Sequence, residues 1–186
     1  MSLMNIGLRY ETKTSLELET DTRVDDTSIL GDPMFPDGEK IPADMPAMIA
    51  AGISYSVFAN LRVEGSYTYY LNSGVDWEEN SEDYVDNSQE IGLAVEYAVF
   101  PNLELSIGGL KSTMGAMKEY QSDLSYSLDS QSLGTGFQYH FTNGISASVG
   151  FSKTFYELGE NARTGVFAEE YDKTSVVYAF GIHYSL

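Results

Sequence analysis

The last stretch of the chain, Thr174–Leu186, alternates between two kinds of side chain. One set is large and apolar or aromatic, and the other is smaller or polar; the large set comprises Val176, Tyr178, Phe180, Ile182, Tyr184 and Leu186. Successive side chains of a β-strand point to opposite faces of its sheet. The stretch therefore predicts a strand with one continuous oily face and one small, polar face.

The same alternation recurs in segments along the whole chain, so the sequence predicts an all-β protein. The expected strands cover residues 5–20, 47–58, 61–72, 89–100, 103–112, 131–141, 144–156 and 174–186. In each strand the large residues share one face, as Ile91, Leu93 and Val95 do in the fourth. A soluble sheet buries such a face against a second layer, whereas a membrane barrel turns it towards lipid.

Two kinds of connection join the expected strands. Three are two-residue turns, each preceded by a phenylalanine: Phe58 before Ala59-Asn60, Phe100 before Pro101-Asn102 and Phe141 before Thr142-Asn143. The others are long, mostly acidic loops over residues 21–46, 73–88, 113–129 and 157–173. Short periplasmic turns and long extracellular loops are typical of outer-membrane barrels. We therefore predict an antiparallel up-and-down transmembrane β-barrel of about eight strands over residues 5–186, with long acidic extracellular loops.

Charge and composition exclude several classes of function. The 28 acidic residues outnumber the 10 basic ones, for a formal net charge of -18. A chain of this charge repels nucleic-acid phosphates, so no nucleic acid is expected as a partner. The sequence contains no Cys, which excludes a disulfide framework and a thiolate metal site. No apolar run approaches the roughly 18 residues of a transmembrane helix.

The start of the chain carries no basic and apolar export signal. Residues 1–4 indicate an artificial or truncated start, because strand pattern follows them at once. An outer-membrane protein needs an export signal, so we expect either a mature chain or a piece of a larger barrel.

Polar residues gather on the predicted inner face and aromatic residues at the turn end. The expected lumen network comprises Arg9, Lys13, Arg62, Glu64, Glu96 and Glu104. An eight-stranded barrel leaves no open pore, so we interpret this network as a salt-bridged interior. A polar channel or a cationic site for a carboxylate is the alternative. The expected aromatic girdle at the inner membrane interface comprises Phe58, Phe100, Phe141 and Tyr184.

Two further patterns were weighed as reactive or metal sites. His140 and His183 point inward near the turns, within reach of Ser146 or Ser148, and a Ser–His pair suggests a nucleophile. Hydrogen bonding inside the lumen accounts for these residues better, so no enzymatic activity and no catalytic residue are expected. The acidic loop Asp76–Asp86 lacks the Gly and the ligand spacing of an EF-hand, so no metal site or cofactor is expected.

Several short motifs resemble those of the FadL-type outer-membrane transporters of long-chain fatty acids and aromatic hydrocarbons. They lie in residues 6–10 and 16–19, in the Pro-containing segment 41–46 that leads into 51–55, in 61–69, and in the closing segment 180–186. Tyr70 stands where the family usually has Trp, and Leu186 stands where it usually has Phe. The resemblance covers most of the chain but depends on short, degenerate motifs.

The resemblance implies a location in the outer membrane of a Gram-negative cell and passive uptake of hydrophobic small molecules such as fatty acids or hydrocarbons. Partners would be outer-membrane lipid or lipopolysaccharide and a hydrophobic ligand. Barrels of the family have 14 strands and an N-terminal plug, so the chain would be the C-terminal part, and its open edges could pair or swap with another chain. No ligand-binding residue is carried over. A complete eight-stranded structural or adhesion barrel and a soluble β-sandwich or lipocalin-like carrier are the alternatives.

Overall fold

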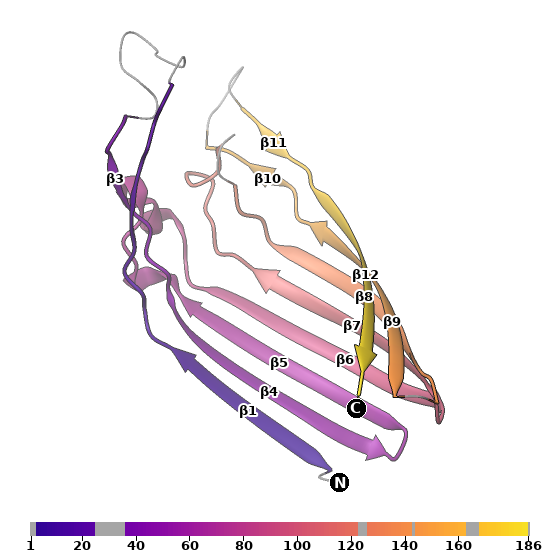
Figure 1. The fold of residues 1–186 in the computed structure, drawn as a ribbon. Helices are drawn as coiled ribbons and strands as arrows, with labels where there is room; N and C mark the ends of the chain where they lie inside the picture. Colours follow the sequence, from indigo (N-terminus) through magenta and orange to yellow (C-terminus); the bar gives the residue numbers. More distant parts are fainter. Residues whose placement is uncertain (1–2, 25–35, 123–125, 143, 163–167, 186) are drawn as a thin grey trace.

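The computed structural model describes residues 3–24, 36–122, 126–142, 144–162 and 168–185, with the backbone alone at 78–80 (Figure 1). Its main element is one antiparallel sheet whose eight strands pair in chain order. The strands are β1 (Met4–Glu11), β4 (Ala47–Phe58), β5 (Leu61–Leu71), β6 (Ser88–Phe100), β7 (Leu103–Thr113), β8 (Ser130–His140), β9 (Ile145–Tyr156) and β12 (Thr174–Tyr184). The predicted all-β, antiparallel up-and-down architecture is confirmed.

The described residues contain no helix that is long and apolar enough to cross a membrane.

Seven of the eight expected strands lie within two residues of their predicted bounds, and the first does not. The prediction of one strand over residues 5–20 is wrong, because β1 ends at Glu11 and a separate strand, β2 (Glu17–Glu19), pairs with β3 (Lys40–Pro42). The chain leaves the sheet between β1 and β2 because Lys13 and the Leu16 N–H both bind the Asp44 carboxylate. Alternation alone could not reveal this contact.

The expected loops also contain short ordered elements. Two 3-10 helices, η1 (Asn72–Gly74) and η2 (Glu78–Tyr84), follow β5, and the short strands β10 (Gly159–Glu160) and β11 (Glu170–Tyr171) pair after β9. Other parts of the expected loops, together with Met1, Ser2, Asn143 and Leu186, lie outside the described residues.

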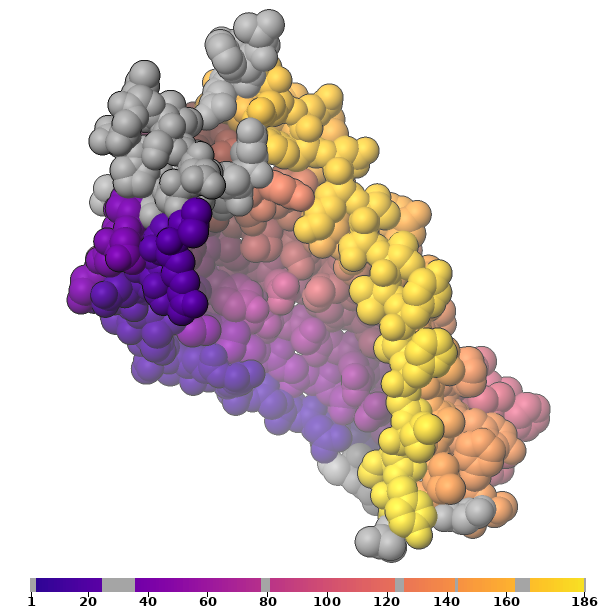
Figure 2. Space-filling model, turned by 45° about the horizontal axis from the view of Figure 1, so that its top comes forward, coloured from indigo at the N-terminus to yellow at the C-terminus, as the bar shows by residue number. Residues whose placement is uncertain are grey.

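The sheet curves into a trough that is open along its two outermost strands (Figures 1 and 2). β1 and β12 stand at opposite ends of the strand order and do not pair with each other. The eight strands therefore form a barrel-type wall that is not closed in this structure. The tight turns and both chain ends lie at one end of the wall, and the long loops lie at the other (Figure 1).

A β-bulge precedes the first two tight turns. The register shifts between Ser56 and Phe58, which places Phe58 opposite Leu61, and the same shift in β6 places Phe100 opposite Leu103. Residues directly opposite each other in an antiparallel pair share a face, and a bulge adds one residue to one strand. The bulges therefore turn both phenylalanines to the oily face, which uninterrupted alternation would not have done.

The oily face is the convex one, and no protein layer covers it. Leu93 is 69% exposed, Ile107 63%, Leu133 62% and Phe180 80%. Among the described residues, buried apolar side chains are confined to Val75, Val85 and Leu128, all of which lie at the loop end. A soluble sandwich would bury this face, so the sheet has the side-chain distribution of a lipid-facing barrel wall.

A charge placed at the middle of the convex face should destabilise the folded wall. We expect Val95→Arg to cost about 2–4 kcal/mol of folding free energy in lipid, and Glu96→Gln, on the concave face, to cost far less. Urea titrations of the folded protein in phospholipid vesicles measure both values. A larger loss for Glu96→Gln would reverse the assignment of the two faces.

Candidate functional site: the concave trough

The concave face holds an open cavity of about 1100 Å³ (Figure 2). Small residues form its floor at mid-height and follow one another across the sheet through the strand register. These floor residues are Gly7, Gly52, Ser66, Gly92, Ala94, Ser106, Gly108, Gly134, Gly136, Gly150, Ala179 and Gly181. None of these residues carries a charge, and the carboxylates of Glu64, Glu96 and Glu104 line the same cavity beside them.

Two floor positions show why larger side chains are absent there. A Cβ atom at Gly92 would lie 2.5 Å from the Ser66 hydroxyl oxygen. A Cβ atom at Gly136 would lie 3.1 Å from the Ser106 hydroxyl oxygen and 3.2 Å from the Val149 carbonyl oxygen. Because the inner surface of a curved sheet brings neighbouring side chains together, glycine is needed where the opposite residue already fills the space.

Arg62 is the centre of a charge cluster near the turn end. Its guanidinium lies 3.1 Å from the Glu96 carboxylate on β6 and 3.4 Å from the Glu64 carboxylate on its own strand. These three members of the expected lumen network therefore come together. One cation shared by two partly exposed carboxylates orders the side chains but adds little stability.

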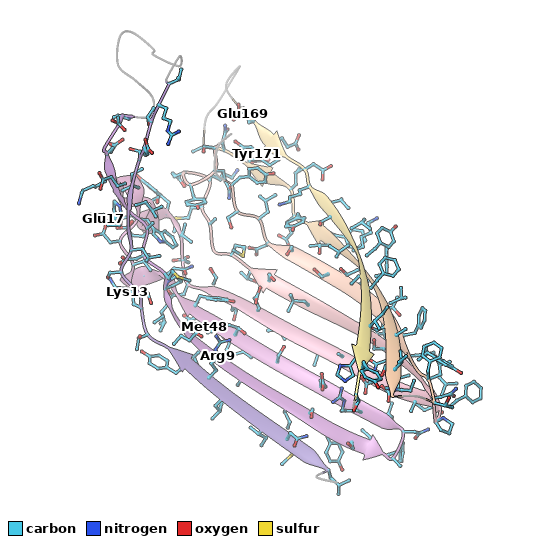
Figure 3. The ribbon with its side chains drawn as sticks, in the orientation of Figure 1. Arg9, Lys13, Glu17, Met48, Glu169 and Tyr171 are labelled. Atoms are coloured by element: carbon cyan, nitrogen blue, oxygen red, sulfur yellow. The ribbon has the colours of Figure 1, made fainter. Side chains whose placement is uncertain are left out.

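The other expected network members lie in separate groups. Arg9 pairs with Glu11 on β1, on the same side of the sheet as Met48 (Figure 3). Lys13 lies beyond the end of β1, and its Nζ atom is 2.8 Å from an Asp44 oxygen. Glu104 lies 3.5 Å from the His140 Nε2 atom. The structure thus places the six expected network residues in four groups of contacts.

His140 contacts both a carboxylate and a hydroxyl. Its Nδ1 atom lies 3.2 Å from the Ser146 hydroxyl, and the other ring nitrogen faces Glu104 and Gln138. His183 is the register partner of Ser146 on the other side. A serine, a histidine and an acid in contact can form a nucleophilic site, but here the groups also serve as cross-strand hydrogen bonds.

A hydrogen-bonded cluster joins three strands at the loop end of the trough. The Glu90 carboxylate accepts hydrogen bonds from the Ser112 hydroxyl at 3.1 Å and from the Tyr70 hydroxyl at 3.4 Å. Above it, the buried Asn72 amide donates to the Ser88 hydroxyl at 2.6 Å and to the Asp86 carbonyl at 2.9 Å. These bonds tie the strand ends to the first ordered loop.

Asp44 connects three segments of the rim and was not singled out by the sequence analysis. Its buried carboxylate accepts hydrogen bonds from Lys13 Nζ at 2.8 Å, the Leu16 N–H at 3.1 Å and the Asp76 N–H at 3.2 Å. Its backbone carbonyl accepts a bond of 2.8 Å from the Trp77 indole. The one sequence signal for this role was the position of an acid between two prolines, Pro42 and Pro46. Prolines interrupt strand pairing, so nearby backbone N–H groups need another acceptor, which a carboxylate can supply.

The pKa of Asp44 is held below its ordinary value of 3.8, chiefly by the hydrogen bond from Lys13. At the opposite rim, the ion pair between Lys118 and Glu160 lowers the pKa of Glu160 and raises that of Lys118. Both pairs join loop segments far apart in the sequence. Lys13 and Glu17 mark one rim of the trough, and Glu169 and Tyr171 mark the other (Figure 3).

The expected girdle residues are spread along the turn end of the sheet, from β4 to β12. The rings of Tyr139 and Phe141 are in edge contact, with centroids 4.8 Å apart, and Tyr184 pairs with Ile145. Phe58 and Phe100 are 66% and 60% exposed. Their role as a membrane girdle remains a prediction.

The part of the chain that the structure describes contains no group of three or more His, Asp or Glu side chains arranged to hold a metal ion.

No family model matches the sequence, and no curated protein matches it. Two solved structures share its fold. A Pseudomonas aeruginosa FadL homologue is 12% identical with a TM-score of 0.71, and the alignment covers 97% of this chain and 49% of that one. The CymD monoaromatic hydrocarbon channel is 14% identical with a TM-score of 0.61, covering 100% and 48%.

The chain therefore has the fold of a FadL-type β-barrel wall, and it spans about half the length of the two structures it matches. The resemblance inferred from the sequence motifs is confirmed at the level of the fold.

Protonation of Asp44 should loosen the rim. Because the folded state lowers this pKa, the carboxylate stabilises the rim above pH 3.8 and loses this effect as the pH falls through the lowered value. Trp77 is the one tryptophan of the chain and bonds to Asp44, so its fluorescence reports the change. We expect a shift in Trp77 emission below pH 3.8 that Asp44→Asn largely removes.

Asp76→Asn is the matched control, because Asp76 contacts Asp44 through its backbone: its N–H donates to the carboxylate and its carbonyl accepts from the Asp44 N–H. An unchanged acid transition in Asp44→Asn would show that other groups hold the rim.

Proposed function

We propose that this chain forms part of an outer-membrane wall that allows passive uptake of hydrophobic small molecules, such as fatty acids or hydrocarbons. The observation that carries this proposal is the division of one sheet into an uncovered oily convex face and a hollow, small-residue concave face. The fold of a FadL homologue and of a monoaromatic hydrocarbon channel supports it.

The uncharged floor of the trough suits passage of apolar solutes. Charged groups hold water strongly, and displacing that water costs free energy. Glycine, alanine and serine at mid-height present no such groups, whereas Arg62 and its partners lie nearer the turns. A solute that moves along these small residues therefore meets its largest desolvation cost where Glu64, Glu96 and Glu104 line the cavity. No enzymatic step is needed for this activity.

The surroundings that fit the wall are those of a Gram-negative outer membrane. The convex face would contact lipid, with Phe58, Phe100, Phe141 and Tyr184 at the periplasmic interface. The acidic loops would then lie outside the cell. The turn and loop asymmetry of the sheet supports this placement.

Filling the trough should reduce uptake. Gly52 lies on the floor, and a Cβ atom there would meet nothing closer than the Gly65 carbonyl at 3.8 Å, so the backbone accepts a side chain and Gly52→Phe adds bulk to the trough. We expect uptake of a labelled fatty acid and a monoaromatic hydrocarbon by cells to fall by about twofold or more, because side chains fill narrow barrel interiors.

Ile53→Phe is the control, because Ile53 is the next residue along β4, 47% exposed on the convex face. Equal uptake by wild-type protein, Gly52→Phe and cells without the protein would disprove the proposed transport.

We also propose that the open edges of β1 and β12 pair with strands of a second copy when this chain is alone in a membrane. In hydrocarbon every backbone polar group needs a partner, so an unpaired edge is costly. β1 and β12 run in opposite directions, so two copies can pair edge to edge while remaining antiparallel throughout. Light scattering of the purified chain in detergent should give the mass of two copies. A folded particle with the mass of one copy would contradict this pairing.

A further inference from the structure

Two lysines interrupt the oily convex face near its loop end. Within the eight strands, all of them described, every Asp, Glu, Arg and His side chain belongs to the concave set of alternating positions. Lys111 on β7 and Lys153 on β9 belong to the convex set. Lys111 lies opposite Ile91, and Lys153 lies between Leu133 and Val176 on the two neighbouring strands. They are therefore the two charged residues on the convex face of the sheet.

Neither lysine has a carboxylate partner within the described residues. Arg9, Lys13, Arg23, Lys40, Arg62 and Lys118 each form an ion pair, whereas Lys111 and Lys153 on the convex face form none, nor does Lys173, which lies in a loop over the Tyr126 and Tyr156 rings. The Lys153 ammonium lies 4.6 Å from the centre of the Phe155 ring, which holds the charge over the outer surface. In a chain with 28 acidic residues, this lack of pairing leaves two positive charges for an external anion.

The height of the lysines matches a membrane interface. Lys111 follows Leu103, at the turn end of β7, by eight residues, which is about 27 Å along a strand at about 3.4 Å per residue. At a tilt of about 40° this is roughly 21 Å across the membrane, close to the 25 Å apolar band of an outer-membrane barrel. The lysines therefore lie level with the head groups on the loop side.

A hollow of about 530 Å³ lies beside Lys111 on this face. Gly109 leaves a gap between Leu93 and Leu133, its register partners on either side, and Phe155 and Ile91 also line the hollow. An acyl chain fits such an apolar gap. Two strand spacings, about 10 Å, separate β7 from β9, so two lysine side chains can approach one phosphorylated head group.

We propose that Lys111 and Lys153 form a binding site for a phosphorylated lipid of the outer leaflet, with its phosphate on the two ammonium groups and an acyl chain over Gly109. This inference rests on the proposed membrane function, because only that placement puts the convex face in lipid. Charge complementarity supports the occupant, since the site is positive on an otherwise acidic protein. Glu157 lines the hollow at its loop end and is the one carboxylate there.

The test measures lipid binding to the full chain in detergent micelles by native mass spectrometry. The probes are phosphorylated lipid A, the same lipid without its phosphates, and inorganic phosphate. We expect the wild-type chain to prefer phosphorylated lipid A by about thirtyfold, from two lysines near the surface. Lys111→Met with Lys153→Met should remove this preference while keeping the apolar stems.

Lys118→Met and Glu157→Gln are the matched controls. Lys118 lies in a loop and pairs with Glu160, so its loss should leave lipid binding unchanged, and Glu157→Gln should leave it equal or stronger. Binding of phosphorylated lipid A by the double variant within about twofold of wild type would overturn the site. Equal competition by inorganic phosphate would overturn the lipid as its ligand.

The two proposals fail in distinguishable ways. A chain that forms no β-structure in micelles, by circular dichroism, would overturn the membrane placement and the lipid site with it. A folded chain that supports uptake but shows no preference for the phosphorylated lipid would overturn the site alone.

Discussion

The structure depends on backbone hydrogen bonding within a single sheet: each strand is held by the ladder to its neighbours, with β1 and β12 each paired along one edge only, while the side chains do almost no packing. Apolar side chains are buried only at Val75, Val85 and Leu128 within the described residues, so hydrophobic collapse does not hold the strands together. In water such a wall would expose its convex face. In hydrocarbon the same face costs nothing to expose, and the paired backbone becomes the main source of stability.

Much of the fold could be predicted from alternation, because the period of two is local and uninterrupted in seven of the strands. The first strand failed for a nonlocal reason: Lys13 and Leu16 continue the pattern but bind Asp44, which is far along the chain. The pattern also could not predict whether the sheet closes into a barrel. Alternation determines which face of the sheet each side chain takes, and it does not determine the curvature of the sheet.

The sequence predicts which side chains face the trough, but it does not predict which of them contact one another. Inward positions of Arg62, Glu64 and Glu96 follow from the strand period, and the register then brings them together. Register depends on the turns, and the bulges before Phe58 and Phe100 shift it in a way that no propensity signals. The importance of Asp44, Lys111 and Lys153 emerged only once their neighbours on other strands were known.

The small packed core lies at the loop end of the wall, so the two ends of the wall differ in local stability. There Asn72, Gln121 and Asn161 are buried and hydrogen-bonded to other segments, as in a water-soluble domain. The tight turns at the opposite end have only their own strands to hold them. Thermal fraying should therefore begin at the hairpins with tight turns and move towards the long loops, with the loop end of the trough keeping its shape longest.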